Sequence, residues 1–293
     1  MLVFVIVGNF TPHSEHQHEA RARTTRMNRI DAKFAELRRQ KRTALIPFVE
    51  AGDPDLATTF EIIRMLEKNG ADLIELGVPF SDPMADGPTI QRSSERALKA
   101  GATLPRVLEL VRKLRKETEI PIVLFGYYNP IFHYGARRLA RDAKNAGVDG
   151  ILCVDLPPEE SRELKSCLDK EELDLIFLLA PTSDEERIRR VAREGRGFVY
   201  YVSVTGVTGA RSTVEDHLAS QVKRIRRYTS LPVGVGFGIS TPDQAAWIAS
   251  FADAAVVGSA LISVMEREQK KERKVEKAGR FIAGLKQAMS GGK

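Results

Sequence analysis

Residues 71–91, ADLIELGVPFSDPMADGPTIQ, combine a strand pattern, a loop and the start of a helix. The apolar segment 71–76 carries a carboxylate, Glu75, near its C-terminal end. A loop rich in Pro, Gly and Asp follows at once and holds Asp82 and Asp86. The stretch therefore predicts one βα unit. A charge at the end of a buried strand is costly unless it is paired or used, so the loop also marks a candidate site.

The same alternation of strand and helix patterns continues along the chain from Thr43 onward. Apolar runs predict strands at 44–49, 72–76, 120–125, 150–154, 173–179, 197–202, 232–236 and 254–257. Helical patterns follow near 55–69, 88–116, 134–146, 159–171, 184–194, 213–228, 241–250 and 260–286. The strand runs are nearly continuous in Val, Ile and Leu, which is typical of strands covered on both faces. Eight such units predict an α/β fold of the (β/α)8 TIM barrel type.

A doubly wound open sheet is the alternative architecture. No Gly-x-Gly-x-x-Gly motif follows the first strand, which disfavours a dinucleotide-binding version of that fold. In a barrel, the active site is built from loops at the C-terminal ends of the strands. Glu50, Glu75 and Asp155 are acidic residues at such ends.

The chain has 293 residues, and we expect residues 27–293 to form a single barrel domain with an added N-terminal helix. Ile30, Phe34 and Leu37 recur at helical spacing after Met27. Residues 1–26 contain three histidines that offer a metal-binding alternative. We interpret them instead as a disordered polar leader, or as residues before a native start at Met27.

Composition and charge exclude several classes of protein. Apolar residues make up 43% and charged residues 29% of the chain, as in soluble globular proteins. No apolar run approaches the roughly 18–20 residues that span a membrane. The net charge of +6 is not concentrated in a basic patch, because Lys, Arg and Glu interleave along 266–286, so we expect no nucleic-acid partner. Two cysteines, Cys153 and Cys167, form neither a disulfide framework nor a metal motif, which fits a reducing cytoplasm.

The three carboxylates of the opening stretch each have an ordinary explanation as well as a chemical one. The ordinary explanation of Glu75 is a buried ion pair, and that of Asp82 is a turn residue before proline. For Asp86 it is a residue that precedes the start of a helix. Together they place one carboxylate on the barrel wall and two on the adjoining loop. A carboxyl group in an apolar pocket has a raised pKa and shuttles protons near neutral pH. A second, ionised carboxylate holds a ring N–H or stabilises developing positive charge.

Glycine and hydroxyl residues gather after the sixth, seventh and eighth predicted strands. They occur in the segments 205–209, 234–240 and 258–259. Barrels commonly hold a phosphate after strands seven and eight, where glycine backbones turn N–H groups toward an anion. Tight turns without a ligand are the alternative. Apolar residues at the strand ends predict either plain core or a pocket for a flat apolar substrate.

In these motifs the chain resembles the alpha subunit family of tryptophan synthase. The resemblance rests on residues 75–91, on IPFV at 46–49 and GDP at 52–54, and on VTGVTG at 204–209, GFGIS at 236–240 and GS at 258–259. It runs from about Met27 to the C-terminal helix, with the motifs in the order of the family. It implies a lyase that cleaves indole-3-glycerol phosphate to indole and glyceraldehyde 3-phosphate by a retro-aldol reaction.

The resemblance also assigns roles to residues. Glu75 matches the proton shuttle and Asp86 the carboxylate that binds the indole N–H. Substrate-pocket positions match Phe48, Ile90, Phe125, Tyr127, Leu152, Tyr200, Thr208 and Phe237. Phosphate contacts match Gly209, Gly238, Gly258 and Ser259. Positions facing a beta subunit match Pro79, Asp82 and Asn129.

The family also implies partners and cofactors. A beta subunit consumes indole, an alpha2beta2 complex is expected, and pyridoxal phosphate belongs to the partner, so no cofactor or metal is expected here. The chain departs from the family in its leader and at Ser203-Val204, where some members carry an arginine. The alternatives are a stand-alone indole-forming lyase, a non-catalytic regulatory partner on the same scaffold, and another phosphate-binding barrel such as an isomerase of the same pathway.

Overall fold

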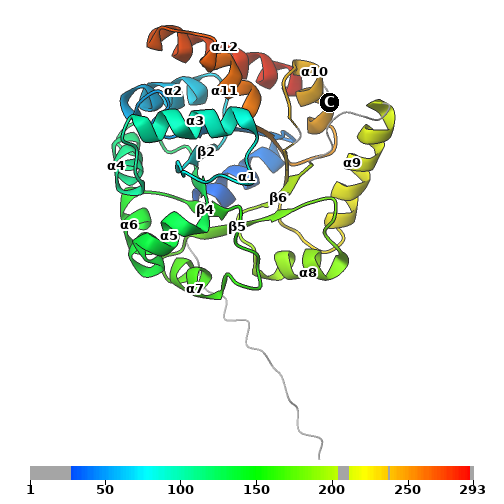
Figure 1. Cartoon of the computed structure of the whole chain (residues 1–293). Coiled ribbons are helices and arrows are strands. Elements are labelled where there is room, and N and C mark those ends of the chain that lie inside the picture. The colour runs from blue at the N-terminus through cyan, green and yellow to red at the C-terminus, as the bar shows by residue number, and fades with distance from the viewer. Residues whose placement is uncertain (1–27, 204–210, 237, 291–293) are drawn as a thin grey trace, which may run out of the picture.

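A computed structural model describes residues 28–203, 211–236 and 238–290. Eight parallel strands pair in chain order and close on themselves, because β1 contacts both β2 and β8 (Figure 1). The strands are β1 (Ala44–Glu50), β2 (Ile74–Gly77), β3 (Ile122–Gly126), β4 (Gly150–Cys153), β5 (Asp174–Leu179), β6 (Val199–Val202), β7 (Val233–Gly236) and β8 (Ala254–Val257). The prediction of a (β/α)8 barrel is confirmed.

Helices surround this sheet and cover its outer face (Figure 1). They are α1 (Arg29–Arg39), α2 (Leu56–Lys68), α3 (Pro88–Lys99), α4 (Leu104–Leu114), α5 (Tyr128–Tyr134), α6 (Ala136–Ala146), α7 (Arg162–Lys170), α8 (Glu185–Glu194), α9 (Arg211–Ile225), α10 (Pro242–Ala249), α11 (Ser259–Glu266) and α12 (Lys271–Ser290). No helix in the described part of the chain combines the length and apolarity needed to cross a membrane.

The helix predicted over 88–116 is wrong in extent, because the chain forms α3 and α4 there. Gly101 has a φ of +80° between them, a conformation that a helix interior does not contain. Thr103 then takes an extended N-cap conformation, and Pro105 lies in the first turn of α4. The pattern at 260–286 likewise divides into α11 and α12, and α5 is an additional short helix after β3.

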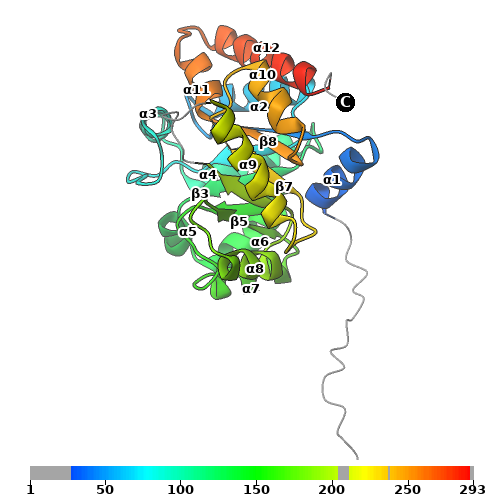
Figure 2. The same cartoon turned by 90° about the vertical axis from the view of Figure 1, so that its right-hand side faces the viewer.

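The added N-terminal helix is present as α1, which lies at one end of the barrel (Figure 2). The Asn28 side chain caps it by accepting hydrogen bonds from the N–H groups of Ile30 and Asp31. Ile30, Phe34 and Leu37 are buried in the cluster that fills the barrel interior, where the ring of Phe34 lies 5.7 Å from that of Phe198. The helix therefore closes the end opposite the βα loops. The predicted leader, 1–26, lies outside the described residues.

Candidate active site

A cavity of about 690 Å³ opens at the C-terminal ends of the strands. All eight strands, or the segments that follow them, contribute residues to its wall. The volume is that of a small-molecule site, and its position is where barrel enzymes carry out their chemistry. The predicted site residues along this cavity are Phe48, Glu75, Asp86, Ile90, Phe125, Tyr200, Gly238, Gly258 and Ser259.

The carboxyl group of Glu75 faces this cavity. Glu75 lies on β2, in register with Phe48 of β1 and Val123 of β3, so its position is fixed by two ladders of the sheet. The residue is 1% exposed, and its Oε1 has no hydrogen-bond partner among the described residues. Burial raises the pKa of Glu75 to about 8. Glu75 is therefore a neutral acid at pH 7 that exchanges a proton with little driving force.

Asp86 lies on the loop between β2 and α3, half-buried, at the edge of the same cavity. Its carboxylate accepts a hydrogen bond of 3.0 Å from the Tyr127 hydroxyl, which itself accepts one from the N–H of Ala85. Burial raises the pKa of Asp86, and the Tyr127 hydrogen bond opposes that shift. The Gln91 side chain donates to the Asp86 carbonyl at 2.8 Å. These contacts hold the Asp86 carboxylate in a defined position on its loop.

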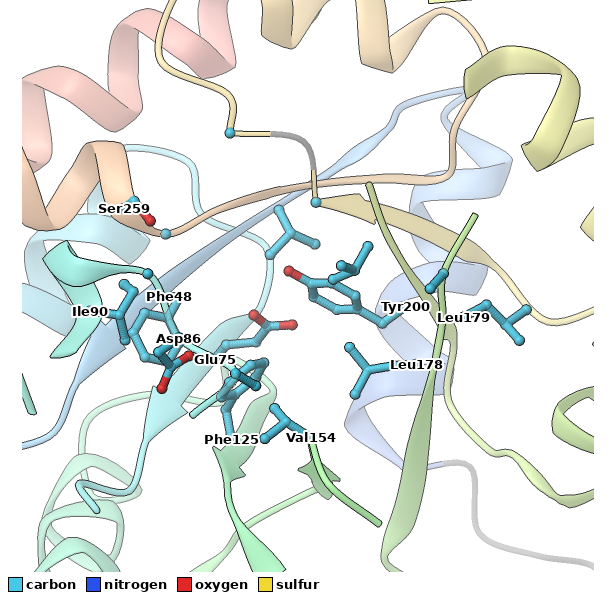
Figure 3. A pocket seen from close by; sticks show the side chains of 18 of the residues that line it. Phe48, Glu75, Asp86, Ile90, Phe125, Val154, Leu178, Leu179, Tyr200 and Ser259 are labelled. Carbon is cyan, nitrogen blue, oxygen red and sulfur yellow. The ribbon is translucent and has the colours of Figure 1, made fainter. Parts of the chain in front are cut away.

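Aromatic and aliphatic side chains form the rest of the wall. The rings of Phe48 and Phe125 meet edge to face at 5.2 Å, and Phe125 lies 6.5 Å from Tyr200. Figure 3 shows the Glu75 carboxylate in the middle of the cavity, with Asp86 to one side and the Tyr200 hydroxyl to the other. A Cβ at Gly236 would lie 2.4 Å from the Tyr200 hydroxyl oxygen, so glycine is required there. This part of the site is an apolar wall that holds the carboxyl groups of Glu75 and Asp86.

Glycines and a helix N-terminus form the part of the cavity beyond β7 and β8. Gly236, Gly238, Gly258 and Ser259 line it, and Ser259 is the first residue of α11. Gly258 occupies the N-cap position and has no side chain to cap the first N–H groups of α11. Such a helix start attracts phosphate through its N–H groups and its dipole.

Some predicted site residues are placed elsewhere or lie outside the described chain. Leu152 does not line the cavity, because its side chain is fully buried in the interior cluster below it. Tyr127 lies behind Asp86 and contacts it instead of lining the cavity. Thr208, Gly209 and Phe237 lie outside the described residues.

The loop after β5 contributes a part of the wall that the sequence analysis did not identify. Thr182, Ser183 and Asp184 line the cavity, together with Arg187. Arg187 is the only cation among the described lining residues, and it pairs with Glu159 at 2.9 Å. The sequence 182–187 carries an ordinary helix-start pattern, and Asp184 does cap α8, so nothing in it distinguished a ligand-facing role.

The three residues predicted to face a partner differ in exposure. Asp82 and Asn129 are exposed, whereas Pro79 is buried within the chain. Met84 and Phe132 are also exposed, at 89% and 65%, on the same loop as Asp82 and on α5. Across the described residues, no group of three or more His, Cys, Asp or Glu side chains is arranged to hold a metal ion.

Comparison with known proteins agrees with this architecture. The family model for the tryptophan synthase alpha chain matches residues 34–290. The tryptophan synthase alpha chain of Geobacter sulfurreducens is 60% identical over 263 residues, which cover 90% of this chain and 99% of the relative. That of Thermoanaerobacter sp. is 45% identical over 263 residues, covering 90% of this chain and all of the relative.

Solved structures give the same result. Tryptophan synthase subunit alpha from Legionella pneumophila superposes with a TM-score of 0.84 at 39% identity, covering 90% of this chain and 99% of that one. A chain of tryptophan synthase from M. tuberculosis, in an open form, superposes with a TM-score of 0.81 at 33% identity, covering 89% and 98%. The chain belongs to the tryptophan synthase alpha chain family.

Proposed function

We propose that Glu75 and Asp86 carry out the alpha half-reaction of tryptophan biosynthesis, the retro-aldol cleavage of indole-3-glycerol phosphate to indole and glyceraldehyde 3-phosphate. Membership of the family supports the reaction. The Glu75 carboxyl group carries the assignment of residues. It is buried and unpaired among the described residues, it faces an apolar cavity, and burial raises its pKa to about 8.

The reaction needs a proton to arrive before a carbon–carbon bond breaks. Neutral Glu75 donates its proton to indole C3, which converts the aromatic ring into an indolenine cation and makes it a leaving group. The Glu75 carboxylate then removes the proton from the hydroxyl on the adjoining glycerol carbon. A carbonyl forms there, the C–C bond breaks, and its electron pair returns to the ring, so Glu75 ends neutral again. A pKa near 8 suits both transfers.

Asp86 supports the step at the other end of the indole ring. Protonation at C3 places positive charge near the ring nitrogen, and an anionic carboxylate that accepts the N–H hydrogen bond stabilises that charge. The hydrogen bond from Tyr127 favours the ionised form of Asp86 against the effect of burial. The glycine turns after β7 and β8 and the uncapped start of α11 supply the site for the phosphate group.

Incubation of the chain with indole-3-glycerol phosphate tests this proposal, with indole and glyceraldehyde 3-phosphate measured as products. We expect indole from the natural chain and none above background from Glu75→Gln. Glu61→Gln, an exposed carboxylate on α2, is the matched control and is expected to react as the natural chain does. No indole from the natural chain, with or without a beta subunit, would favour the non-catalytic regulatory role.

We also propose that the chain works with a tryptophan synthase beta subunit in an alpha2beta2 complex. Two large apolar side chains are exposed near two of the predicted partner-facing residues: Met84 on the loop after β2, with Asp82, and Phe132 on α5, with Asn129. The loop that carries Asp82 and Met84 also carries Asp86, which lines the cavity. Exposed apolar residues with a polar rim are typical of a protein interface.

Mixing the chain with a beta subunit tests the partner by light scattering and by the rate of indole formation. We expect a particle of two chains of each kind and an accelerated reaction. Phe132→Ser weakens the complex, whereas Leu98→Ser is the control, because Leu98 is an exposed apolar residue at the far end of α3. An unchanged rate and no complex would favour the stand-alone lyase.

We propose that this half-reaction uses no cofactor and that pyridoxal phosphate belongs to the beta subunit. Every step above is a proton transfer or a movement of the substrate's own electrons, and Glu75 and Asp86 supply the groups it needs. Indole formation by the chain alone is expected to survive both a chelator and a carbonyl reagent that traps pyridoxal phosphate. Loss of activity with either reagent would contradict this proposal.

A further inference from the structure

Arg187 lines the cavity but has no part in the mechanism above. It lies in the first turn of α8, and its side chain is 37% exposed. The Asp184 side chain accepts the N–H of Arg187 at 2.8 Å, which fixes the backbone from which the guanidinium extends. Because Arg187 is the only cation among the described residues of the cavity wall, its charge at this position calls for an explanation.

The other charged residues of the described wall are acidic. They are Glu75, Asp86 and Asp184. Glu75 is a neutral acid at pH 7, so Asp86 and the exposed Asp184 supply negative charge. The substrate of the proposed reaction carries a phosphate group with a charge of about −1.5 to −2 at that pH. Carboxylates repel such an anion, so its entry into the cavity needs a nearby cation.

The phosphate site contains no cation among the described residues. Glycines and Ser259 form it, and they offer N–H groups and a hydroxyl. Arg187 follows β5, which is separated from β8 by β6 and β7 around the barrel. Figure 3 shows Leu179, at the end of β5, and Ser259 on opposite sides of the Glu75 carboxylate. The cation therefore lies on a different part of the wall from the phosphate site.

An ion pair holds one side of the Arg187 guanidinium. Its Nη1 lies 2.9 Å from Oε2 of Glu159, and Arg190 holds the other oxygen of Glu159 at 3.1 Å. No other side chain in the described part of the chain forms an ion pair with Arg187, so Nε and Nη2 keep N–H groups for an anion. Glu159 is not part of the described wall, so the cavity meets the cation and not its counter-ion.

We propose that Arg187 is a specificity-determining residue for the phosphate group of the substrate: its guanidinium attracts the anion into the cavity and favours phosphorylated over uncharged indole compounds. The inference rests on the proposed function, because it needs a substrate that carries a phosphate. Charge attraction acts beyond contact distance in a cavity with apolar walls. Arg187 takes no part in the proton transfers at Glu75, so its effect belongs to kcat/KM and not to kcat.

Three substitutions on α8 separate a local charge from net charge and from packing. Arg187→Gln removes the charge, and we expect kcat/KM for indole formation to fall about tenfold through KM. Arg187→Lys keeps the charge and is expected to stay within about threefold of the natural chain. Arg189→Gln is the matched control, because Arg189 pairs with Glu185 on the same helix and does not line the described cavity. Its kcat/KM is expected to stay within about twofold.

All three variants are expected to fold. The side chains of Arg187 and Glu159 are 37% and 39% exposed, and an ion pair of that kind contributes little to stability. Melting temperatures of the three variants and of the natural chain check this expectation.

Binding of two ligands that do not react shows whether the effect depends on the phosphate. Glycerol 3-phosphate carries the anion and indole carries none. We expect Arg187→Gln to raise the Kd of glycerol 3-phosphate about fivefold or more and to leave the Kd of indole unchanged. At about 1 M salt, where charges are screened beyond about 3 Å, the difference in glycerol 3-phosphate affinity should disappear.

Four results would overturn the inference. These are a natural KM in Arg187→Gln, equal impairment of Arg187→Gln and Arg189→Gln, equal impairment of Arg187→Gln and Arg187→Lys, and equal weakening of indole and glycerol 3-phosphate binding. Absence of indole from the natural chain would instead refute the proposed function. The binding measurements need no turnover, so the two failures are distinct.

Discussion

Buried carboxyl groups lie at both ends of the barrel, and the two ends differ in whether these groups have ion-pair and hydrogen-bond partners. At the N-terminal ends of the strands, Asp72 accepts the N–H of Leu45 at 2.7 Å and pairs with Lys286. Asp149 accepts the N–H of Ile122 at 2.8 Å and pairs with Arg115 at 2.6 Å.

At the C-terminal ends, Asp53 pairs with Arg96 at 2.7 Å, but two other buried acids differ. Glu50 and Glu75 each keep a buried oxygen without a partner among the described residues. Pairing at one end offsets the desolvation of the charge, whereas an unpaired acid stays neutral and weakens the fold. The difference indicates that the closed end, covered by α1, serves stability, and that the open end sacrifices some stability for proton transfer.

The largest expected effect comes from the open end. Glu75→Gln removes the proton shuttle, and we expect kcat for indole formation to fall about a hundredfold to ten-thousandfold, as for loss of a general acid and base. The amide has the size of the acid, so the fold should persist. A steady-state assay with circular dichroism on the same sample checks both statements. Activity within a few fold of that of the natural chain would contradict the proton-transfer role assigned to Glu75 at the open end.

The closed end should respond in the opposite way. Asp149→Ala leaves Arg115 buried without its carboxylate, and we expect the free energy of unfolding to fall by about 3–5 kcal/mol. The fraction that remains folded should still form indole with an ordinary kcat. Denaturant unfolding and active-site titration measure the two quantities separately. A stable Asp149→Ala chain with lost activity would reverse the roles assigned to the two ends.

Stability should depend on pH through Glu75. Its pKa is about 8 in the folded chain, against 4.5 for an ordinary glutamate, so between these values only the folded chain holds the proton. This stabilising contribution is fully present below about pH 4.5 and is lost as the pH rises through about 8. The stability of Glu75→Gln relative to the natural chain should therefore increase by up to about 4 kcal/mol between about pH 5 and pH 8. A stability difference between the two chains that does not vary with pH would contradict the raised pKa of Glu75.

The smallest effect is expected at Asp86, on the loop. Asp86→Asn keeps the shape but loses the charge, and we expect kcat/KM to fall about tenfold to a hundredfold, as for a hydrogen bond to a charged group. Glu95→Gln, an exposed position on α3, controls for general effects of a lost charge. Equal kinetics for the two variants would remove Asp86 from the mechanism.

Local patterns in the sequence were sufficient for the barrel and for part of the site. Eight apolar runs predicted the eight strands because each is nearly continuous in apolar residues, as in strands that are buried on both faces. Glu75 and Asp86 were identified because charged residues interrupt or follow an apolar run. Leu152 was misplaced because a strand that is apolar throughout carries no mark of which side chains reach the cavity. The break at Gly101 was missed because a glycine within a helical pattern does not reveal its φ.

The features that decide the chemistry in detail arise from packing between distant segments. The sequence marked Glu50 as an acid at a strand end, and only the structure shows that its carboxyl group packs over Gly77. Arg187 and Glu159 meet across α8 and the segment before α7, and their pairing follows no local pattern. Contacts of this kind depend on how helices and loops close over the strands, which a single sequence does not specify.

The protonation state of Glu75 tests the central claim most directly. Difference infrared spectroscopy between the natural chain and Glu75→Gln isolates the carboxyl band of this residue across a pH titration. The contrast between the two ends predicts a protonated carboxyl group at neutral pH that ionises near pH 8. A carboxylate that is already ionised at pH 6, as expected for an ordinary paired glutamate, would contradict it.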